Sequence, residues 1–397
     1  MMLLGAAAWS VLLGWADWLR RRPDLVSVAR STELDPLNAQ GYRAKALYEE
    51  LAGQDSTASW KRAAELSPRD ARILIPAGIQ AETMGDLRTA EAYLRQAERY
   101  NKLWLPRWTL ANYYARRGDQ AQTFSWLSAA LERSYGETQA AFQLAVDTGA
   151  SESVIASRVV PNAAHPLGQF FYFVARKAIA TEEVSLLESL AVKFVGLSSQ
   201  DRRGFAQGYP LLALIDRLLL DNFGEVAARL WYLGCQAGLI DSSPREADGI
   251  IVNGSFRHSF VGHGLDWYLF SPPGISAVQH RGPGTVKISF TGLQRGTSRL
   301  LSQTLAIPPN RTWRVSFEFG TQAINSRQPA FAWMLGDEIL PLADPMVSEG
   351  WASNSFLIPA SDAPRTVPLV LVVRDLPGMV RPEGELWIRN VKGAVAK

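Results

Sequence analysis

The chain has 397 residues, of which 47% are apolar and 20% are charged, and its formal net charge is +3. This composition is typical of globular protein and the length allows two or three domains, so wholesale disorder is excluded. Residues 247–397 carry 14 Lys and Arg against 11 Asp and Glu, which leaves the preceding part of the chain neutral. Neither part has the basic surplus that nucleic-acid binding requires, so nucleic acid is not an expected partner. Cys235 is the only cysteine, which excludes an intrachain disulfide.

Residues 1–22 form a candidate membrane anchor. Leu3 to Leu19 is apolar except for Ser10 and Asp17, and arginines follow at positions 20 to 22. This stretch is short for a membrane span, which usually needs about 20 residues. A signal-anchor helix is the favoured interpretation; the alternatives are an interfacial helix held by its tryptophans and the arginines, and a soluble first helix. No Lys or Arg precedes the stretch and no small-residue cleavage pattern follows it, so a removable signal peptide is not expected.

A repeat runs through residues 27–134. Gly53, Gly85 and Gly118 are spaced 32 and 33 residues apart. A period of this length is typical of solenoids built from two-helix units. Glycine suits the turn between the two helices of a unit because it adopts left-handed backbone conformations without strain. The pattern predicts an α-solenoid that continues as divergent helical hairpins through residues 135–246.

Residues 71–102 contain the best unit of the repeat. Its small and apolar positions, with the turn between the helices, are Leu74, Ala77, Gly78, Ala81, Gly85, Asp86, Ala90, Leu94 and Ala97. On these residues the segment resembles the tetratricopeptide repeat family, although Lys102 replaces the usual proline. The resemblance implies a concave surface that binds a protein partner. The candidate partner-binding residues on this surface are Asn112, Tyr113, Arg116 and Arg117.

The pattern changes to short alternating strands in residues 247–397. Apolar Val286, Ile288 and Phe290 alternate with polar residues, for example. This period of two indicates strands with one face buried and one face in water. Candidate strands recur at regular spacing with Pro and Gly between them, which predicts an antiparallel jelly-roll β-sandwich.

Three segments of this region carry a resemblance. They are Asn253-Gly254-Ser255-Phe256, Ser302 to Pro308 with Trp313 to Phe317, and Glu385 to Val391. On these residues the region resembles the galactose-binding-like sandwiches, which include many carbohydrate-binding modules. Members often hold a structural calcium through acidic residues of the first and last strands, where this chain has Ser255, Arg257 and Asn390. Calcium prefers several carboxylate and carbonyl oxygens, so neither a metal nor a cofactor is predicted.

Aromatic side chains provide the ligand hypothesis for the sandwich. Exposed rings stack on the apolar faces of sugars, while polar side chains bind the hydroxyl groups. The candidate glycan-binding residues are Trp267, Tyr268, Trp333, Trp351, Arg314 and Gln303. Core packing is the alternative role for the aromatic members of this set. Trp313 and Trp387 stand among apolar neighbours and are predicted to lie in the core.

No catalytic constellation is recognisable in the sequence. His258, His263 and His280 lie in the sandwich, but their spacing fits no zinc-binding motif. Asp337 and Glu338 are adjacent, and a glycosidase pair cannot be inferred from such a position. The protein is therefore predicted not to be an enzyme, and a hydrolase is the least favoured alternative.

The order of anchor, repeats and sandwich resembles that of accessory proteins of bacterial exopolysaccharide and cell-envelope assembly. The resemblance implies a membrane-tethered scaffold on the extracytoplasmic, periplasmic side, with a protein partner on the solenoid and a polysaccharide on the sandwich. The arginines at positions 20 to 22 alone favour a cytoplasmic C-terminal side, which conflicts with this location. The alternative function is a purely structural scaffold whose sandwich binds no small ligand.

Overall fold

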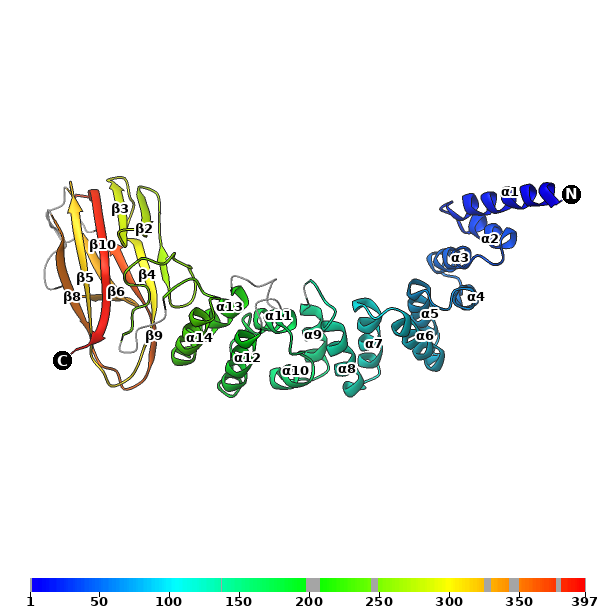
Figure 1. Ribbon diagram of the computed structural model, residues 1–397, viewed down its shortest axis with the longest axis horizontal. Helices are drawn as coiled ribbons and strands as arrows, with labels where there is room; N and C mark the ends of the chain where they lie inside the picture. Colours follow the sequence, from blue (N-terminus) through cyan, green and yellow to red (C-terminus); the bar gives the residue numbers. More distant parts are fainter. Residues whose placement is uncertain are drawn as a thin grey trace. The chain divides into compact units, whose positions relative to one another are not determined.

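The computed structural model describes residues 2–136, 138–197, 208–243, 249–324, 330–342, 350–375 and 380–396. The chain forms two compact units, Met1–Pro161 and Asn162–Lys397. The first unit contains helices, and the second contains helices followed by two β-sheets (Figure 1). The expected fold class, a tetratricopeptide-type α-solenoid followed by an antiparallel β-sandwich, is confirmed.

The helices of the first unit pack as successive pairs, α1 with α2, α3 with α4, α5 with α6 and α7 with α8. Their bounds are α1 (Met2–Arg20), α2 (Leu25–Leu34), α3 (Ala39–Leu51), α4 (Thr57–Leu66), α5 (Ala71–Thr83), α6 (Leu87–Tyr100), α7 (Trp104–Arg116), α8 (Gln120–Leu131), α9 (Gln139–Asp147) and α10 (Glu152–Arg158).

The repeated Gly-Asp dipeptides explain how two of these pairs form. Gly85 and Gly118 have positive φ angles of 83° and 70°, which end α5 and α7 in a left-handed turn. The next residue in each case, Asp86 or Asp119, then caps the following helix by accepting a hydrogen bond from a backbone N–H of its first turn. Between α5 and α6, a Cβ atom on Gly78 would lie 2.8 Å from the Leu94 side chain, so glycine is needed for this close approach.

Helix α1 occupies most of the predicted anchor segment. It packs against α2, and its Ala16 and Leu19 are buried, whereas Trp9, Trp15 and Trp18 are each more than half exposed. Among the described residues, none of the helices combines the length and the apolarity that crossing a membrane requires.

The second unit begins with helices and ends with strands. Its helices are α11 (Ala164–Val174), the short 3₁₀ helix η1 (Thr181–Glu183), α12 (Val184–Gly196), α13 (Tyr209–Leu220) and α14 (Gly224–Gln236). Its strands are β1 (Trp267–Leu269), β2 (Ile275–His280), β3 (Thr285–Thr291), β4 (Ser298–Ile307), β5 (Trp313–Gln322), β6 (Phe331–Leu335), β7 (Glu338–Leu340), β8 (Ala352–Ile358), β9 (Arg365–Val373) and β10 (Glu383–Val395).

The strands form two antiparallel sheets, ordered β1-β4-β9-β6-β7 and β2-β3-β10-β5-β8. We call the second the β10 sheet, after its central strand. One continuous apolar core contains side chains from both sheets, which identifies the arrangement as a sandwich (Figure 1). Within β5, Trp313, Val315, Phe317 and Phe319 are buried, whereas Arg314, Ser316 and Glu318 face outward. The period-two pattern expected for this region is therefore present.

The last helices are built into the sandwich unit. Helix α14 contacts β4, and Gly224 at its start lies so close to Ala306 that an added Cβ would come within 2.9 Å of it. On α13, Asp216 Oδ1 accepts a hydrogen bond from the backbone N–H of Gly264, 2.6 Å away. The segment expected to continue the solenoid, residues 135–246, is thus divided between the two units. The expected boundary between residues 246 and 247 lies outside the described residues.

Candidate functional sites

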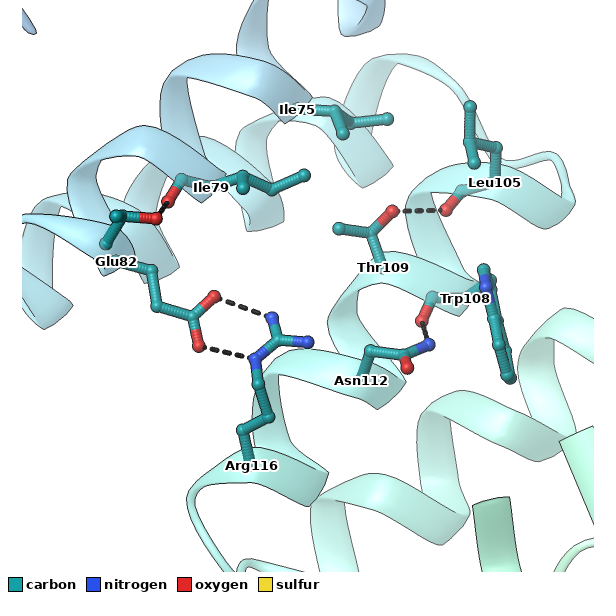
Figure 2. A pocket seen from close by; sticks show the side chains of 9 residues that line it. Ile75, Ile79, Glu82, Leu105, Trp108, Thr109, Asn112 and Arg116 are labelled. Carbon is teal, nitrogen blue, oxygen red and sulfur yellow. Dashed lines mark hydrogen bonds and ion pairs between the residues drawn. The ribbon is translucent and has the colours of Figure 1, made fainter. Parts of the chain in front are cut away.

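An open hollow lies between α5 and α7 in the first unit (Figure 2). Its volume is about 560 Å³. The lining residues are Ile75, Ile79, Glu82 and Thr83 from α5, and Leu105, Trp108, Thr109, Asn112 and Arg116 from α7. Ile75, Ile79 and Thr83 are four positions apart on α5, and Trp108, Asn112 and Arg116 are four positions apart on α7, so each helix presents one face to the hollow. We call this hollow the α5–α7 groove.

The groove combines exposed apolar side chains with a fixed ion pair. Ile79 and Leu105 remain exposed within it, although both are large and apolar. Arg116 donates to both carboxylate oxygens of Glu82, with Nε to Oε1 at 2.9 Å and Nη2 to Oε2 at 2.6 Å (Figure 2). This contact with the Glu82 carboxylate raises the pKa of Arg116 above its ordinary value. A forked pair of this kind joins α5 to α7 in a defined geometry.

The groove contains two of the four predicted partner-binding residues. Asn112 and Arg116 line it, and the Asn112 side chain donates to the Trp108 carbonyl at 2.8 Å. Tyr113 is buried, and its hydroxyl donates to the Leu87 carbonyl at 2.9 Å, so its prediction as a surface contact is wrong. Arg117 stacks over the Tyr113 ring, 5.4 Å from its centroid, and does not line the groove.

Sequence reasoning missed the apolar part of the groove. Ile75 and Ile79 are four residues apart on the first helix of one unit, and Leu105 and Trp108 are three apart on the first helix of the next. This spacing was the available signal, but it is also that of ordinary core positions. Only the packing of α5 beside α7 leaves Ile79, Leu105 and Trp108 partly in water, while Ile75 is buried at the base of the groove.

Three of the six predicted glycan-binding residues lie in the sandwich core. Trp267 and Trp333 are 0% exposed, and their ring centroids are 6.3 Å apart. Gln303 is 1% exposed and satisfies the buried backbone of Val252, donating to its carbonyl at 2.8 Å. These side chains cannot reach a ligand in solution, so their prediction as an exposed face is wrong. Trp267 and Trp333 are buried because they pack in the core between the two sheets, and Gln303 is buried because it binds the Val252 backbone.

The other three predicted residues are exposed, but on different sheets. Tyr268 is 47% exposed and belongs to β1, at the edge of the sheet that contains β4. Trp351 is 44% exposed and directly precedes β8, an edge strand of the β10 sheet. Arg314 faces outward on β5, also in the β10 sheet. The structure therefore associates Trp351 and Arg314 with one sheet and separates them from Tyr268.

A second hollow, of about 510 Å³, lies on the outer face of the β10 sheet. Its lining residues are Gly320, Thr321, Gln322, Gly350, Trp351 and Trp387. We call it the Trp351–Trp387 hollow. In the strand register Trp387 is the partner of Gly320, and a Cβ atom on Gly320 would lie 3.9 Å from the Trp351 ring. The missing side chain at Gly320 keeps the space beside the two rings open.

Trp387 is half-buried on the outer face, so its prediction as a core residue is wrong. The neighbouring Leu386 and Ile388 are both fully buried. Because side chains alternate along a strand, these two positions direct Trp387 to the opposite face. The signal was present in the sequence, but Leu386, Trp387 and Ile388 are three consecutive apolar residues, and this concealed the alternation.

A cationic side chain lies over each of the two tryptophan rings of this hollow. The Arg389 guanidinium lies 3.8 Å from the centroid of the Trp351 ring, and the Lys287 ammonium lies 5.1 Å from that of Trp387. Arg389 Nε also donates to Glu318 at 2.7 Å. Hydrogen bonds from Asn390 and Arg389 hold the pKa of Glu318 below its ordinary value. The rings are thus held by cation–π contacts whose cations are themselves positioned by carboxylates.

His263 and His280 of the sandwich contact different residues and lie in different places. His263 Nδ1 is 2.7 Å from Asp216, whereas His280 stacks on Trp387 with ring centroids 5.7 Å apart. Among the described residues, no group of three or more His, Cys, Asp and Glu side chains is placed to hold a metal ion.

These features define a class: a tetratricopeptide-type α-solenoid joined to an antiparallel β-sandwich. No protein-family model matches the chain. No curated protein matches it either.

Solved structures resemble separate parts of the chain. One, described as "CBM4 structure and function", is 12% identical, with a TM-score of 0.26 over 36% of this chain and 98% of that one. YrrB, described as a TPR protein with an unusual peptide-binding site, is 13% identical, with a TM-score of 0.25 over 53% of this chain and 91% of that one. PilF of Pseudomonas aeruginosa is 13% identical, with a TM-score of 0.28 over 58% of this chain and 92% of that one.

Proposed function

We propose that the protein is a non-enzymatic scaffold whose α5–α7 groove binds an extended segment of a protein partner. The observation that carries this proposal is the groove itself, in which Ile79 and Leu105 stay exposed beside the Glu82–Arg116 pair. Apolar side chains of a peptide would displace water from Ile79, Leu105 and Trp108, which is the main favourable contribution to binding. The polar side chains of the groove, Glu82, Asn112 and Arg116, would bind polar groups of the peptide and so set its register.

Selection from a random-peptide phage library on the full-length protein tests this groove. The selected peptides should bind the Ile79→Asp and Trp108→Ala variants at least about tenfold more weakly, because each change removes an apolar contact of roughly 1.4 kcal/mol or more. Fluorescence polarisation with labelled peptides measures the affinities. The matched control is Leu51→Asp, which introduces the same charge at an exposed apolar residue outside the groove. Equal affinity for the wild-type protein and Ile79→Asp would contradict the proposal.

The second part of the proposal is that the sandwich binds glycan at the Trp351–Trp387 hollow. Two partly exposed indole rings beside an open space suit stacking against sugar rings, and Thr321 and Gln322 supply polar groups at its edge. In affinity electrophoresis of the full-length protein through a panel of polysaccharides, Trp351→Ala and Trp387→Ala should abolish retardation. The control Tyr268→Ala removes an exposed ring from the other sheet and should leave retardation unchanged.

The alternative, a sandwich that binds no small ligand, is favoured by the burial of Trp267 and Trp333. Large aromatic residues in the core serve packing, so their number alone does not indicate a binding site. Absence of retardation by every polysaccharide, for a protein that still binds the selected peptides, would favour this alternative over glycan binding.

The third part of the proposed function concerns attachment to a membrane and cellular location. We place the protein at the extracytoplasmic face of a bacterial membrane, attached through α1, with a role in polysaccharide assembly or export. The exposed Trp9, Trp15 and Trp18 support this attachment, since tryptophan favours the membrane–water interface. Carbonate extraction of membranes from expressing cells tests whether α1 is integral, and protease accessibility in spheroplasts tests the side. Protection from protease in intact spheroplasts would contradict the extracytoplasmic location.

A further inference from the structure

We propose that the glycan of the sandwich is acidic, and that Arg314 and Lys392 bind its carboxylate groups. The polysaccharide would begin at the Trp351–Trp387 hollow and extend along β5 and β10 toward Arg314. This inference rests on the proposed glycan binding and adds the chemical class of the ligand and its direction on the sheet.

The strand register aligns the residues concerned as successive cross-strand pairs. Trp387 pairs with Gly320, Arg389 with Glu318, Lys392 with Ser316, and Ala394 with Arg314. A rise of about 3.3 Å per residue gives roughly 20 Å from the hollow to Arg314, which is room for several sugar units.

A β-bulge in β10 keeps Lys392 on the same face as Trp387. The register shifts between Arg389 and Lys392, so that β10 contains one residue more than β5 at this point. After the shift Val391 is buried in the core, and Lys392 is exposed. Without the extra residue, the strict alternation that makes Arg389 face outward would turn position 392 toward the core.

Among the described residues along this path, basic side chains outnumber acidic ones. Arg389 is paired with Glu318 at 2.7 Å, and Lys287 on the neighbouring strand is paired with Glu385. Within the part of the chain that the structure describes, neither Arg314 nor Lys392 forms an ion pair. The adjoining strand β8 contributes Ser353, Ser355 and Leu357 to the outer face, and none of these is acidic.

Arg314 and Lys392, which form no ion pair within the described residues, lie beyond the two rings of the hollow, and this arrangement fits a polysaccharide that carries uronic acids. The rings would hold a sugar face near Trp351, and each base would bind a carboxylate further along the chain. Both bases face water, so salt screens each of these contacts. Acidic-sugar recognition should therefore weaken as salt concentration rises, whereas stacking on the rings should not.

Isothermal titration of the full-length protein tests the inference. The probes are oligomannuronate and oligogalacturonate, each paired with its carboxyl-reduced, neutral counterpart of the same backbone. At low salt we expect at least one uronate to bind about tenfold more tightly than its neutral counterpart. Arg314→Ala combined with Lys392→Ala should remove this difference while leaving the neutral affinity unchanged. Trp351→Ala should weaken both.

The control variant combines Arg295→Ala with Arg299→Ala, which removes the same charge from exposed positions outside the β10 sheet. An equal loss of uronate binding in this control would overturn the inference in favour of nonspecific attraction. Equal affinity for charged and reduced glycans, lost in Trp351→Ala, would overturn the acidic specificity while glycan binding stands. If the wild-type protein binds none of these probes, the inference of an acidic ligand is overturned. If a neutral polysaccharide still retards the protein in affinity electrophoresis, the proposed glycan binding stands without acidic specificity.

Discussion

Asp266 shows how a single acidic residue holds the start of the sandwich together. Its carboxylate is buried and accepts hydrogen bonds from the backbone N–H groups of Val261 and Trp267, at 3.0 and 2.8 Å, and from the Asn253 amide. Burial raises the pKa of this carboxyl above its ordinary value, against the opposing effect of these donors. The residue thus positions the 253–267 segment at the cost of burying a charge.

Asp266→Asn should destabilise the second unit by about 1–3 kcal/mol, because the new NH₂ group faces a backbone N–H and leaves it without an acceptor. The dependence on pH has a defined sign. Since the folded-state pKa is raised, the wild-type protein gains stability relative to the variant as pH falls through that pKa, and the gain is complete below the unfolded-state pKa. Urea unfolding at several pH values measures both effects.

The matched control is Asp362→Asn, at an exposed acidic residue of the same unit, which should be nearly neutral at every pH. A stability difference between wild-type protein and Asp266→Asn that stays constant between pH 7 and 4 would contradict the role assigned to the buried carboxyl.

Among the strands, a close approach between two backbone segments holds the bulge of β10 in place. Val391 donates its N–H to the Gly254 carbonyl at 2.9 Å, which ties the β10 bulge to the segment that precedes β1. A Cβ atom on Gly254 would lie 1.8 Å from the Val391 carbonyl oxygen. Only glycine permits this contact.

Gly254→Ala should therefore destabilise the second unit by about 1–3 kcal/mol, because the backbone must move to make room for the methyl group. Gly282→Ala is the matched control, because a Cβ atom at that position meets nothing within 4 Å. Its effect should stay within about 0.5 kcal/mol. Denaturant unfolding followed by tryptophan fluorescence compares the two, and equal stability of both variants would refute the constraint.

At the scale of the whole molecule, the compact units do not coincide with the change from helices to strands. Trp231 of α14 lies against Gly264, where an added Cβ would come within 2.6 Å of the ring, and Asn222 accepts a hydrogen bond from the Thr366 N–H at 2.9 Å. The sandwich therefore shares packing surface with α13 and α14.

A fragment of residues 162–397 should consequently melt at a higher temperature than one of residues 247–397, by at least about 5 °C, because the shorter fragment exposes the surface that α14 covers. Differential scanning calorimetry measures the two midpoints. The variant Asn222→Gly in the longer fragment removes the hydrogen bond with Thr366 and keeps a residue that tolerates the left-handed backbone of the position, so it should lower the midpoint by a smaller amount. Identical midpoints for the two fragments would show that the helices contribute nothing to the thermal stability of the sandwich.

Much of the fold follows from local patterns. The Gly-Asp dipeptides at residues 85–86 and 118–119 specify both a left-handed turn and a helix cap, so the two-helix units could be predicted. Alternation along β5 specified which of its residues are buried. Both signals depend on nearest neighbours in the chain, which is why sequence periodicity carries them.

The candidate sites were less predictable because exposure depends on what covers a residue. Trp267, Trp333 and Trp351 are chemically alike, yet the first two are buried in the sandwich core and the third is 44% exposed. Trp387 becomes a possible ligand platform because its cross-strand partner is Gly320, which is 67 positions away in the chain. Periodicity and turn chemistry are sufficient to predict a helical-repeat region followed by a β-sandwich. Which side chains are exposed side by side depends on packing between strands and helices that are distant in the chain, so no local sequence pattern contains this information.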